Sequence, residues 1–174
     1  MRINPIGRFD ANFYALTPLI RKGKDAMKHS LRASALLSVL AFTSIPATAA
    51  EWTSGYGMGT TEYTVTDESG NELYIACPGS DGEYVHAYAK IHGQSYSSKN
   101  DPGFNVILDG TEYGNPFDTM CRICGQAFPS FWEHLRTAQT LQISQDGQTV
   151  TLPTTGIDVL KPLNHPENTC QSAW

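Results

Sequence analysis

The stretch GEYVHAYAKIHG, residues 82–93, has the clearest strand pattern in the chain. Apolar and polar side chains alternate along it, which is typical of a strand with one buried face. Its apolar face consists of Val85, Ala87, Ala89 and Ile91. Its other face consists of Tyr84, His86, Tyr88, Lys90 and His92. This second face is either an exposed recognition surface, since aromatic side chains often anchor interfaces, or a packed layer of a sandwich.

The segments before this strand predict a β-hairpin. Residues 61–67 and 72–77 both alternate in polarity, and the turn residues ESGN separate them. Cys77 shares the apolar face of its strand with Leu73 and Ile75. We therefore expect the Cys77 side chain to point into the core.

Other segments complete the β-rich pattern. The glycine-rich residues 51–60 predict an irregular lead-in, and residues 93–103, which end in Pro and Gly, predict a loop. Residues 104–110 predict a strand, which a turn then leads into an edge strand or loop. The pair Asp146 and Gly147 lies between two alternating segments and predicts a second hairpin.

Residues 129–139 predict one amphipathic helix. Pro129 lies just before Ser130, and Ser130 and Glu133 have the spacing of a capping box. The apolar stripe of this helix consists of Phe131, Leu135 and Ala138, with Trp132 beside it. This spacing favours a role for the aromatic residues as core anchors.

The order of these elements predicts the fold class. Residues 156–163 are compatible with one helical turn, before a loop that ends at Cys170. No alternation of strands and helices indicates a parallel sheet. We therefore expect an α+β, mainly β domain, in which an antiparallel sheet or small sandwich is covered by one amphipathic helix and braced by disulfides.

Residues 27–50 have the pattern of a secretory signal peptide. Lys28 and Arg32 form a basic start, an apolar run follows over residues 33–45, and the segment ends in ATAA. The apolar run is shorter than the roughly 20 residues that a bilayer span requires. The pattern therefore predicts export to the periplasm of a Gram-negative bacterium, or secretion.

We expect signal cleavage after Ala50, so that residues 1–50 are an upstream extension with the signal peptide and residues 51–174 are a single mature domain. Translation is expected to start at Met27. The mature domain has 5 basic and 15 acidic groups, and 5 − 15 gives a formal charge of −10. Such a chain repels phosphate backbones and anionic lipids, which argues against nucleic-acid or membrane partners and is compatible with a cationic protein.

All four cysteines lie in the mature domain: Cys77, Cys121, Cys124 and Cys170. An even number in an exported chain is typical of two disulfides, and three pairings are possible. A long closed loop stabilises a fold by roughly 3–5 kcal/mol, whereas a two-residue loop adds little. We expect Cys121 and Cys124 to act separately or locally as clasps near the helix entry. Cys77 and Cys170 then supply the long-range partners.

The segment MCRICG, residues 120–125, has two alternative interpretations. A dithiol oxidoreductase site needs a helix that begins at its first cysteine, whereas the predicted helix begins near residues 129–131, after Cys124. A zinc site needs a second pair of ligands, and His134 and His165 are single. We therefore expect structural disulfides, with no catalytic residue, metal or cofactor.

The C-terminal half resembles the invasion-associated locus B family of small exported bacterial proteins. The similar segments are CRIC, FPSFWEHLRTAQTL, LQISQDGQTVTLP and TGIDVLKPL, within residues 121–163. The resemblance implies a periplasmic or secreted, disulfide-bonded, non-enzymatic β-rich domain, and it supplies no catalytic residues. The short spacing of CRIC and the additional Cys170 depart from that family's pattern.

These observations predict a non-catalytic periplasmic or secreted protein that binds another macromolecule. An inhibitor, an immunity protein, or an accessory factor of an envelope or conjugation apparatus would fit. No phosphate-binding loop, dinucleotide motif or nucleophile motif is present in the sequence. The alternative is a periplasmic thiol–disulfide or zinc-dependent activity centred on Cys121 and Cys124.

Overall fold

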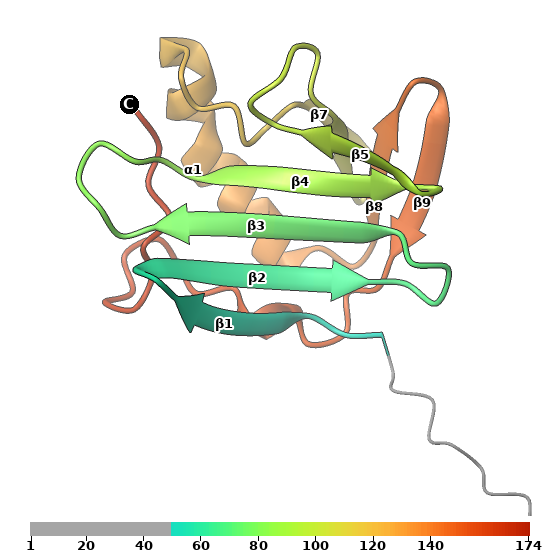
Figure 1. Ribbon diagram of the computed structural model, residues 1–174, viewed down its shortest axis with the longest axis horizontal. Coiled ribbons are helices and arrows are strands. Elements are labelled where there is room, and N and C mark those ends of the chain that lie inside the picture. Colours follow the sequence, from blue (N-terminus) through green and yellow to red (C-terminus); the bar gives the residue numbers. More distant parts are fainter. Residues whose placement is uncertain (1–49) are drawn as a thin grey trace, which may run out of the picture. The chain divides into compact units, whose positions relative to one another are not determined.

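The computed structural model describes residues 50–174, and most of these form two antiparallel sheets and one long helix (Figure 1). The five-stranded sheet consists, in spatial order, of β1 (Thr53–Gly57), β2 (Thr60–Thr66), β3 (Glu72–Pro78), β4 (His86–Ile91) and β5 (Gln94–Ser97). The four-stranded sheet consists, in spatial order, of β7 (Thr111–Gly114), β6 (Asn105–Leu108), β8 (Leu141–Gln145) and β9 (Gln148–Leu152). The helices are α1 (Arg122–Thr137) and the short 3-10 helix η1 (Ile157–Val159). The predicted signal peptide and the predicted start at Met27 lie outside the described residues.

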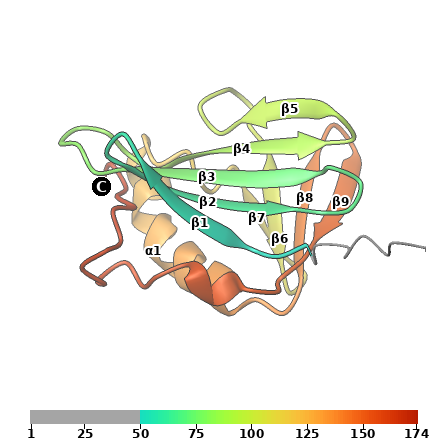
Figure 2. The same ribbon diagram turned by 60° about the horizontal axis from the view of Figure 1, so that its bottom comes forward.

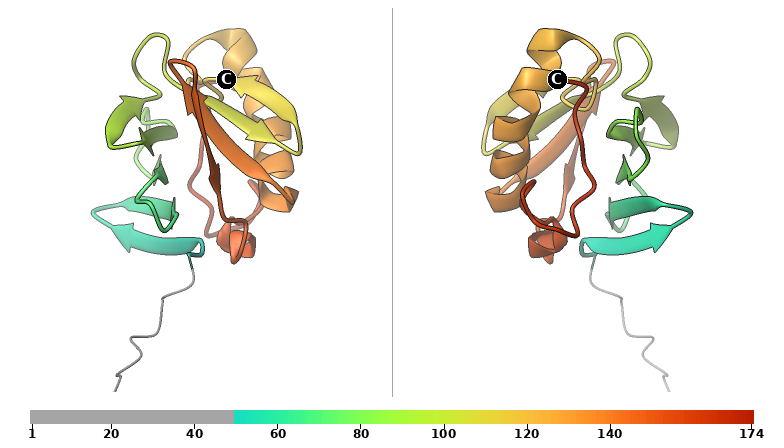
Figure 3. Two further views of the ribbon diagram at one scale, coloured as in Figure 1. Left: turned by 90° about the vertical axis from the view of Figure 1, so that its right-hand side faces the viewer. Right: turned by 90° about the vertical axis from the view of Figure 1, so that its left-hand side faces the viewer.

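One core lies between the two sheets and α1. Figures 2 and 3 show α1 and the four-stranded sheet on the same side of the five-stranded sheet. The five-stranded sheet contributes the buried side chains of Tyr63, Val65, Leu73, Ile75, Ala87, Ala89 and Ile91. The four-stranded sheet contributes Val106, Leu108, Leu141, Ile143, Val150 and Leu152, and α1 contributes Phe128, Phe131, Trp132 and Leu135. The predicted fold class is confirmed.

Aromatic side chains join α1 to its surroundings. Trp132 is fully buried, and its ring meets Tyr63 of β2 edge to face, with 5.9 Å between the ring centroids. Its indole Nε1 donates a hydrogen bond of 2.8 Å to the Lys161 carbonyl. Phe131 packs edge to face against Phe117 at 5.2 Å. Each such pair contributes about 0.5–1.5 kcal/mol beyond area burial, so the predicted core role of the aromatic stripe is confirmed.

Both predicted hairpins are confirmed. In β2–β3, Tyr63 pairs with Ile75. In β8–β9, Asp146 and Gly147 form the turn with φ values of 53° and 74°. Two positive φ values suit the right-handed twist of the strands, and glycine and aspartate adopt them at low cost. The expected edge strand is β7, and the expected helical turn is η1.

Two segments predicted to be irregular form strands instead. All five residues of β1 are exposed, and β1 pairs antiparallel with β2. In the predicted loop 93–103, β5 pairs with β4 after a tight turn at His92 and Gly93, whose φ values are 48° and 83°. Hydrogen bonds to a neighbouring strand hold both edge strands. Periodicity misses them because neither strand has a clear buried side.

The predicted helix start at Pro129 and Ser130 is wrong. α1 begins at Arg122 with Cys121 as its N-cap, and Pro129 lies inside the helix. The Ser130 hydroxyl donates to the Ala127 carbonyl at 2.9 Å instead of capping the helix. An interior proline costs one helical hydrogen bond. Packing of the apolar face, which stabilises most protein helices, carries the helix through this position.

Candidate functional site

The predicted aromatic face lies on the solvent side of the five-stranded sheet, but only three of its five residues belong to β4. His86, Tyr88 and Lys90 alternate with the buried Ala87, Ala89 and Ile91 in β4. Tyr88 is 42% exposed, so no second layer covers this part of the sheet within residues 50–174. The interpretation as a packed sandwich layer is therefore wrong. The outer position of the face is established, whereas recognition remains a prediction.

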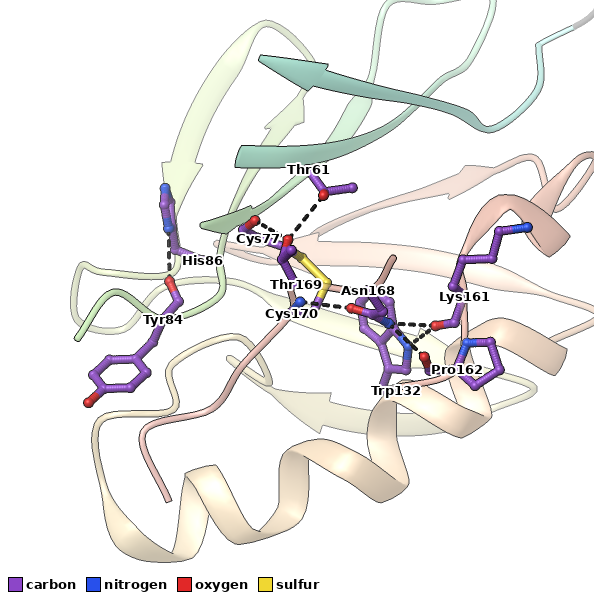
Figure 4. Close-up of a disulfide and its surroundings, with 10 residues drawn as sticks. All are labelled: Thr61, Cys77, Tyr84, His86, Trp132, Lys161, Pro162, Asn168, Thr169 and Cys170. Atoms are coloured by element: carbon purple, nitrogen blue, oxygen red, sulfur yellow. Dashed lines mark hydrogen bonds between the residues drawn. A yellow bond between two sulfur atoms is a disulfide. The ribbon is translucent and has the colours of Figure 1, made fainter. Parts of the chain in front are cut away.

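The other two predicted residues lie outside the strand. Tyr84 precedes β4 and is half-buried, and its carbonyl lies 3.2 Å from the His86 Nδ1 atom. Figure 4 shows the Tyr84 phenol ring pointing away from the His86 ring. His92 lies in the turn after β4 and is exposed. The strand therefore ends one residue before His92, at the turn into β5.

Tyr74 of β3 adds to this surface. The register pairs Tyr74 with Tyr88, and their ring centroids lie 6.1 Å apart. The His86 and Tyr88 rings meet edge to face at 5.9 Å. We name Tyr74, His86 and Tyr88 the outer-face cluster. The alternation of residues 72–77 places Tyr74 on the exposed face, but only the pairing of β3 with β4 places it beside Tyr88.

Partial burial, together with the hydrogen bond to Glu62 and its negative charge, raises the pKa of the Tyr74 phenol to about 12. Tyr74 therefore stays neutral at physiological pH, and its half-buried phenol lies beside the exposed Tyr88. Such a side chain combines a large apolar surface with a hydrogen-bonding group, which is the chemistry of an interface anchor.

A cavity of about 430 Å³ lies at one end of β4. Its lining includes Tyr84, His86, Lys99, Phe117 and Met120. The cavity thus extends from His86, at one end of the outer-face cluster, to Met120, which directly precedes Cys121.

The two disulfides differ in sequence separation and in burial. Cys77 pairs with Cys170 at a sequence separation of 93, and both residues are buried. Cys121 pairs with Cys124 at a separation of 3, and Cys121 is exposed. The expected local clasp at the helix entry and the expected long-range use of Cys77 and Cys170 are both present.

Hydrogen bonds attach the segment around Cys170 to β3 (Figure 4). The Thr169 hydroxyl donates to the Cys77 carbonyl at 2.6 Å. The Cys170 backbone N–H donates to the Asn168 side chain at 2.7 Å, and the Asn168 amide donates to the Lys161 carbonyl at the same distance. A buried disulfide within this network is a structural clasp.

The Cys121–Cys124 disulfide lies at the first turn of α1. Cys121 is the N-cap, and its Sγ accepts a hydrogen bond of 3.1 Å from the Cys124 backbone N–H. A helix that begins after Cys124 would speak against a redox site, and this predicted start is wrong. The helix begins directly after the first cysteine, which is the arrangement that redox-active cysteine pairs require.

The structure also joins three polar side chains that are distant in sequence. The His134 Nε2 atom lies 3.4 Å from the Asp109 carboxylate, and His134 Nδ1 lies 2.7 Å from the Tyr113 hydroxyl. Asp109 also accepts backbone hydrogen bonds from Gln139 and Thr140 at 2.9 and 2.8 Å. These bonds hold the pKa of the Asp109 carboxyl below its usual range. The carboxylate thus fixes the connection between α1 and β8.

Within residues 50–174, no three His, Cys, Asp or Glu side chains converge as ligands for a metal ion. His165, one of the two single histidines that a zinc site would need, accepts a hydrogen bond from the Glu167 backbone N–H at 3.2 Å. No helix in the same part of the chain has the length and apolar character needed to cross a bilayer. The two disulfides are compatible with an exported protein.

Two relatives come from Escherichia coli strain K12. YfjT is 32% identical over 105 residues, which are 57% of this chain and 68% of YfjT. YkfB is 34% identical over 68 residues, which are 36% of this chain and 44% of YkfB. Both are described as uncharacterized proteins, so they indicate no reaction for this chain. The resemblance to the invasion-associated locus B family stays a prediction.

No solved structure matches the chain. The family model of YfjT matches residues 50–160, which include the five-stranded sheet, the four-stranded sheet and α1. Since this match covers more than half of the chain, the protein belongs to the YfjT family.

Proposed function

We propose that this protein is a non-catalytic periplasmic or secreted protein that binds another macromolecule through the outer-face cluster of Tyr74, His86 and Tyr88. The observation that carries this proposal is that, within residues 50–174, no other element covers the outer face of the five-stranded sheet (Figure 3), where Tyr88 is 42% exposed. An inhibitor, an immunity protein, or an accessory factor of an envelope or conjugation apparatus would use such a surface.

The cluster has the features of an interface anchor. Tyrosine is enriched at the energetic centres of protein interfaces, because its ring buries a large area at a low cost in conformational entropy. The ring contacts between Tyr74, Tyr88 and His86 restrict the side chains before binding. A restricted surface loses less entropy on association, which favours affinity.

Charge supports a basic partner. The domain from residue 51 to 174 has a formal charge of −10, from 5 basic and 15 acidic groups. Such a charge accelerates the encounter with a cationic protein and disfavours nucleic acid. We therefore expect the association rate to fall as the salt concentration rises.

The test is capture of a partner from a periplasmic extract by the purified domain and by two variants. Tyr88→Ala should lose at least 90% of the captured partner, because an anchor of this type contributes about 2 kcal/mol or more. Thr151→Ala is the matched control, since Thr151 is exposed on the four-stranded sheet. Equal capture by the wild type, Tyr88→Ala and Thr151→Ala would refute binding through this face.

The alternative, a thiol–disulfide activity at Cys121 and Cys124, has an observation of its own. α1 begins at Arg122, directly after the first cysteine of the pair, and helix N-termini lower the pKa of cysteine thiols. This pair lies at the first turn of α1 and shares no residue with the outer-face cluster.

A further inference from the structure

The two disulfides of this domain occupy opposite environments. Cys77 and Cys170 are 0% and 6% exposed, so a thiol reaches that bond only after the fold opens. Cys121 is exposed, and Cys124 is half-buried behind it. A dissolved thiol can therefore attack Cys121 Sγ in the native state. Access is one of the conditions that decide the rate of thiol–disulfide exchange.

The start of α1 stabilises Cys121 as a thiolate, the form in which the second step of an exchange releases it. Cys121 Sγ already accepts a hydrogen bond from the Cys124 backbone N–H, and a thiolate at this position accepts the same bond more strongly. Helix N-termini carry partial positive charge, and the first turn of α1 contains no acidic residue. Arg122 adds a full positive charge next to Cys121. This environment favours sulfur in its anionic form.

Three exposed apolar side chains lie close to the cysteine pair. Met120, Ile123 and Trp174 are 67%, 81% and 61% exposed, and within residues 50–174 they are half of the six most exposed large apolar side chains. In sequence, Met120 directly precedes Cys121 and Ile123 directly precedes Cys124. Single exposed apolar residues need no explanation, but a group around a reactive bond indicates a contact surface.

The fold holds Trp174 in this group. Its indole Nε1 donates a hydrogen bond of 3.0 Å to the Met120 carbonyl. Its side chain also lies against Gly125, where an added Cβ would come within 3.0 Å of the Trp174 Cβ and Cδ1 atoms. Gly125 therefore leaves the space that Trp174 occupies beside the cysteine pair.

A second apolar feature lies next to Cys124. A cavity of about 280 Å³ is lined by Cys124, Pro116, Phe131 and the ring of Tyr113, among others. Apolar surface thus lies next to both cysteines of the pair. An extended apolar peptide can bury side chains around the disulfide while a cysteine of that peptide reaches Cys121.

We propose that Cys121–Cys124 is an exchangeable disulfide that oxidises a pair of cysteine thiols in an apolar segment of another polypeptide, docked on Met120, Ile123 and Trp174. Thiol–disulfide exchange proceeds by attack of a thiolate, which defines the chemistry of the partner. The proposal does not rest on binding by the outer-face cluster.

The exchange has two balanced steps. A thiolate of the partner attacks Cys121 Sγ, a partner–Cys121 disulfide forms, the Cys121–Cys124 bond breaks, and Cys124 leaves as a thiolate that takes up a proton. The second thiolate of the partner then attacks its own first sulfur and releases Cys121. The partner loses two electrons and two protons as its disulfide forms, and Cys121 and Cys124 gain them as two thiols.

The first test is equilibration of the folded, oxidised domain with mixtures of reduced and oxidised glutathione, followed by alkylation and mass spectrometry. We expect two labels, on Cys121 and Cys124, while Cys77 and Cys170 stay unlabelled and circular dichroism is unchanged. Labelling of all four cysteines together, only as the fold is lost, would overturn the proposal.

The second test identifies the attacked sulfur. Two synthetic peptides serve as probes. A reduced peptide with two cysteines flanked by leucines is the substrate for oxidation. Its single-cysteine analogue, activated as a mixed disulfide with thionitrobenzoate, is used for trapping, because it has no second thiol to release Cys121. Cys124→Ser should form a stable peptide–Cys121 disulfide, whereas Cys121→Ser, which leaves only the half-buried thiol, should trap at least tenfold more slowly. Equal trapping by the two variants would contradict attack at Cys121.

The third test distinguishes a polypeptide partner from a small thiol. In an otherwise wild-type domain, Ile123→Ser should lower the ratio of the peptide oxidation rate to the glutathione rate by about tenfold, the effect of withholding one apolar side chain from the contact. Met58→Ser is the control, because Met58 is exposed and lies in the turn between β1 and β2. An unchanged ratio for Ile123→Ser would overturn the docking surface.

Discussion

The stability of this domain should depend far more on the buried disulfide than on the exposed one. We consider two double variants, Cys77→Ala/Cys170→Ala and Cys121→Ala/Cys124→Ala. Each removes one disulfide and leaves the other intact. They form a matched pair, because the number of sulfur atoms removed is the same.

The magnitude follows from the two loop lengths. In the chain-entropy description, a cross-link over the observed separation of 93 residues stabilises the fold by about 4.6 kcal/mol. A separation of 3 residues gives no more than about 2 kcal/mol. Cys77 is also fully buried within the core, so its replacement removes packing contacts in addition.

Urea unfolding, followed by circular dichroism, measures both free energies. With a slope of about 2 kcal/mol per molar urea, the Cys77/Cys170 variant should unfold about 2 M earlier than the wild type. The Cys121/Cys124 variant should shift by about 1 M or less. A variant that is already unfolded without urea satisfies the first expectation. An equal or larger loss for the Cys121/Cys124 variant would refute the reasoning from loop length and burial.

Three further perturbations test other parts of the structure. Backbone hydrogen bonds hold the pKa of Asp109 below its usual value of 3.8, so its contribution to stability is present above pH 3.8 and is lost as the pH falls further. Asp109→Asn should therefore flatten the acid side of a curve of unfolding free energy against pH. An unchanged curve would argue against a stabilising role of the Asp109 carboxylate. Trp132→Phe removes the hydrogen bond to the Lys161 carbonyl and part of a buried ring. It should lower the free energy of unfolding, measured in urea, by about 2–3 kcal/mol. A decrease below about 0.5 kcal/mol would contradict the packing of Trp132 in the core. Ultraviolet absorbance titration should show one tyrosine that ionises near pH 12, and this transition should be absent in Tyr74→Phe. Because the pKa of Tyr74 is raised in the folded state, its contribution to stability is present below pH 10 and is lost as the pH rises through 12.

Much of the fold could be predicted from local patterns. The alternation in residues 82–93 identifies β4 and its buried face, because one side of that strand lies against the core. The turn residues Asp146 and Gly147 identify the β8–β9 hairpin, because both adopt positive φ. The apolar stripe of α1 is visible for the same reason as the strand, since burial on one side imposes its period on the sequence.

Other features depend on contacts that no local pattern contains. The edge strands β1 and β5 have no clear buried side, and hydrogen bonds to neighbouring strands stabilise them. The start of α1 could not be predicted either, because Pro129 and Ser130 resemble a helix entry. Packing of Phe128 and Phe131 in the core extends the helix to Arg122.

The cysteines show this division most clearly. Their number and the signal-peptide pattern alone predicted disulfides in an oxidising compartment, since both are properties of composition and order. Only the tertiary structure decided that Cys77 meets Cys170, that Cys121 caps a helix, and that Trp174 lies beside Cys121. The reason is that pairing, burial and helix position depend on which distant segments the core brings together, and this proximity leaves no local periodicity.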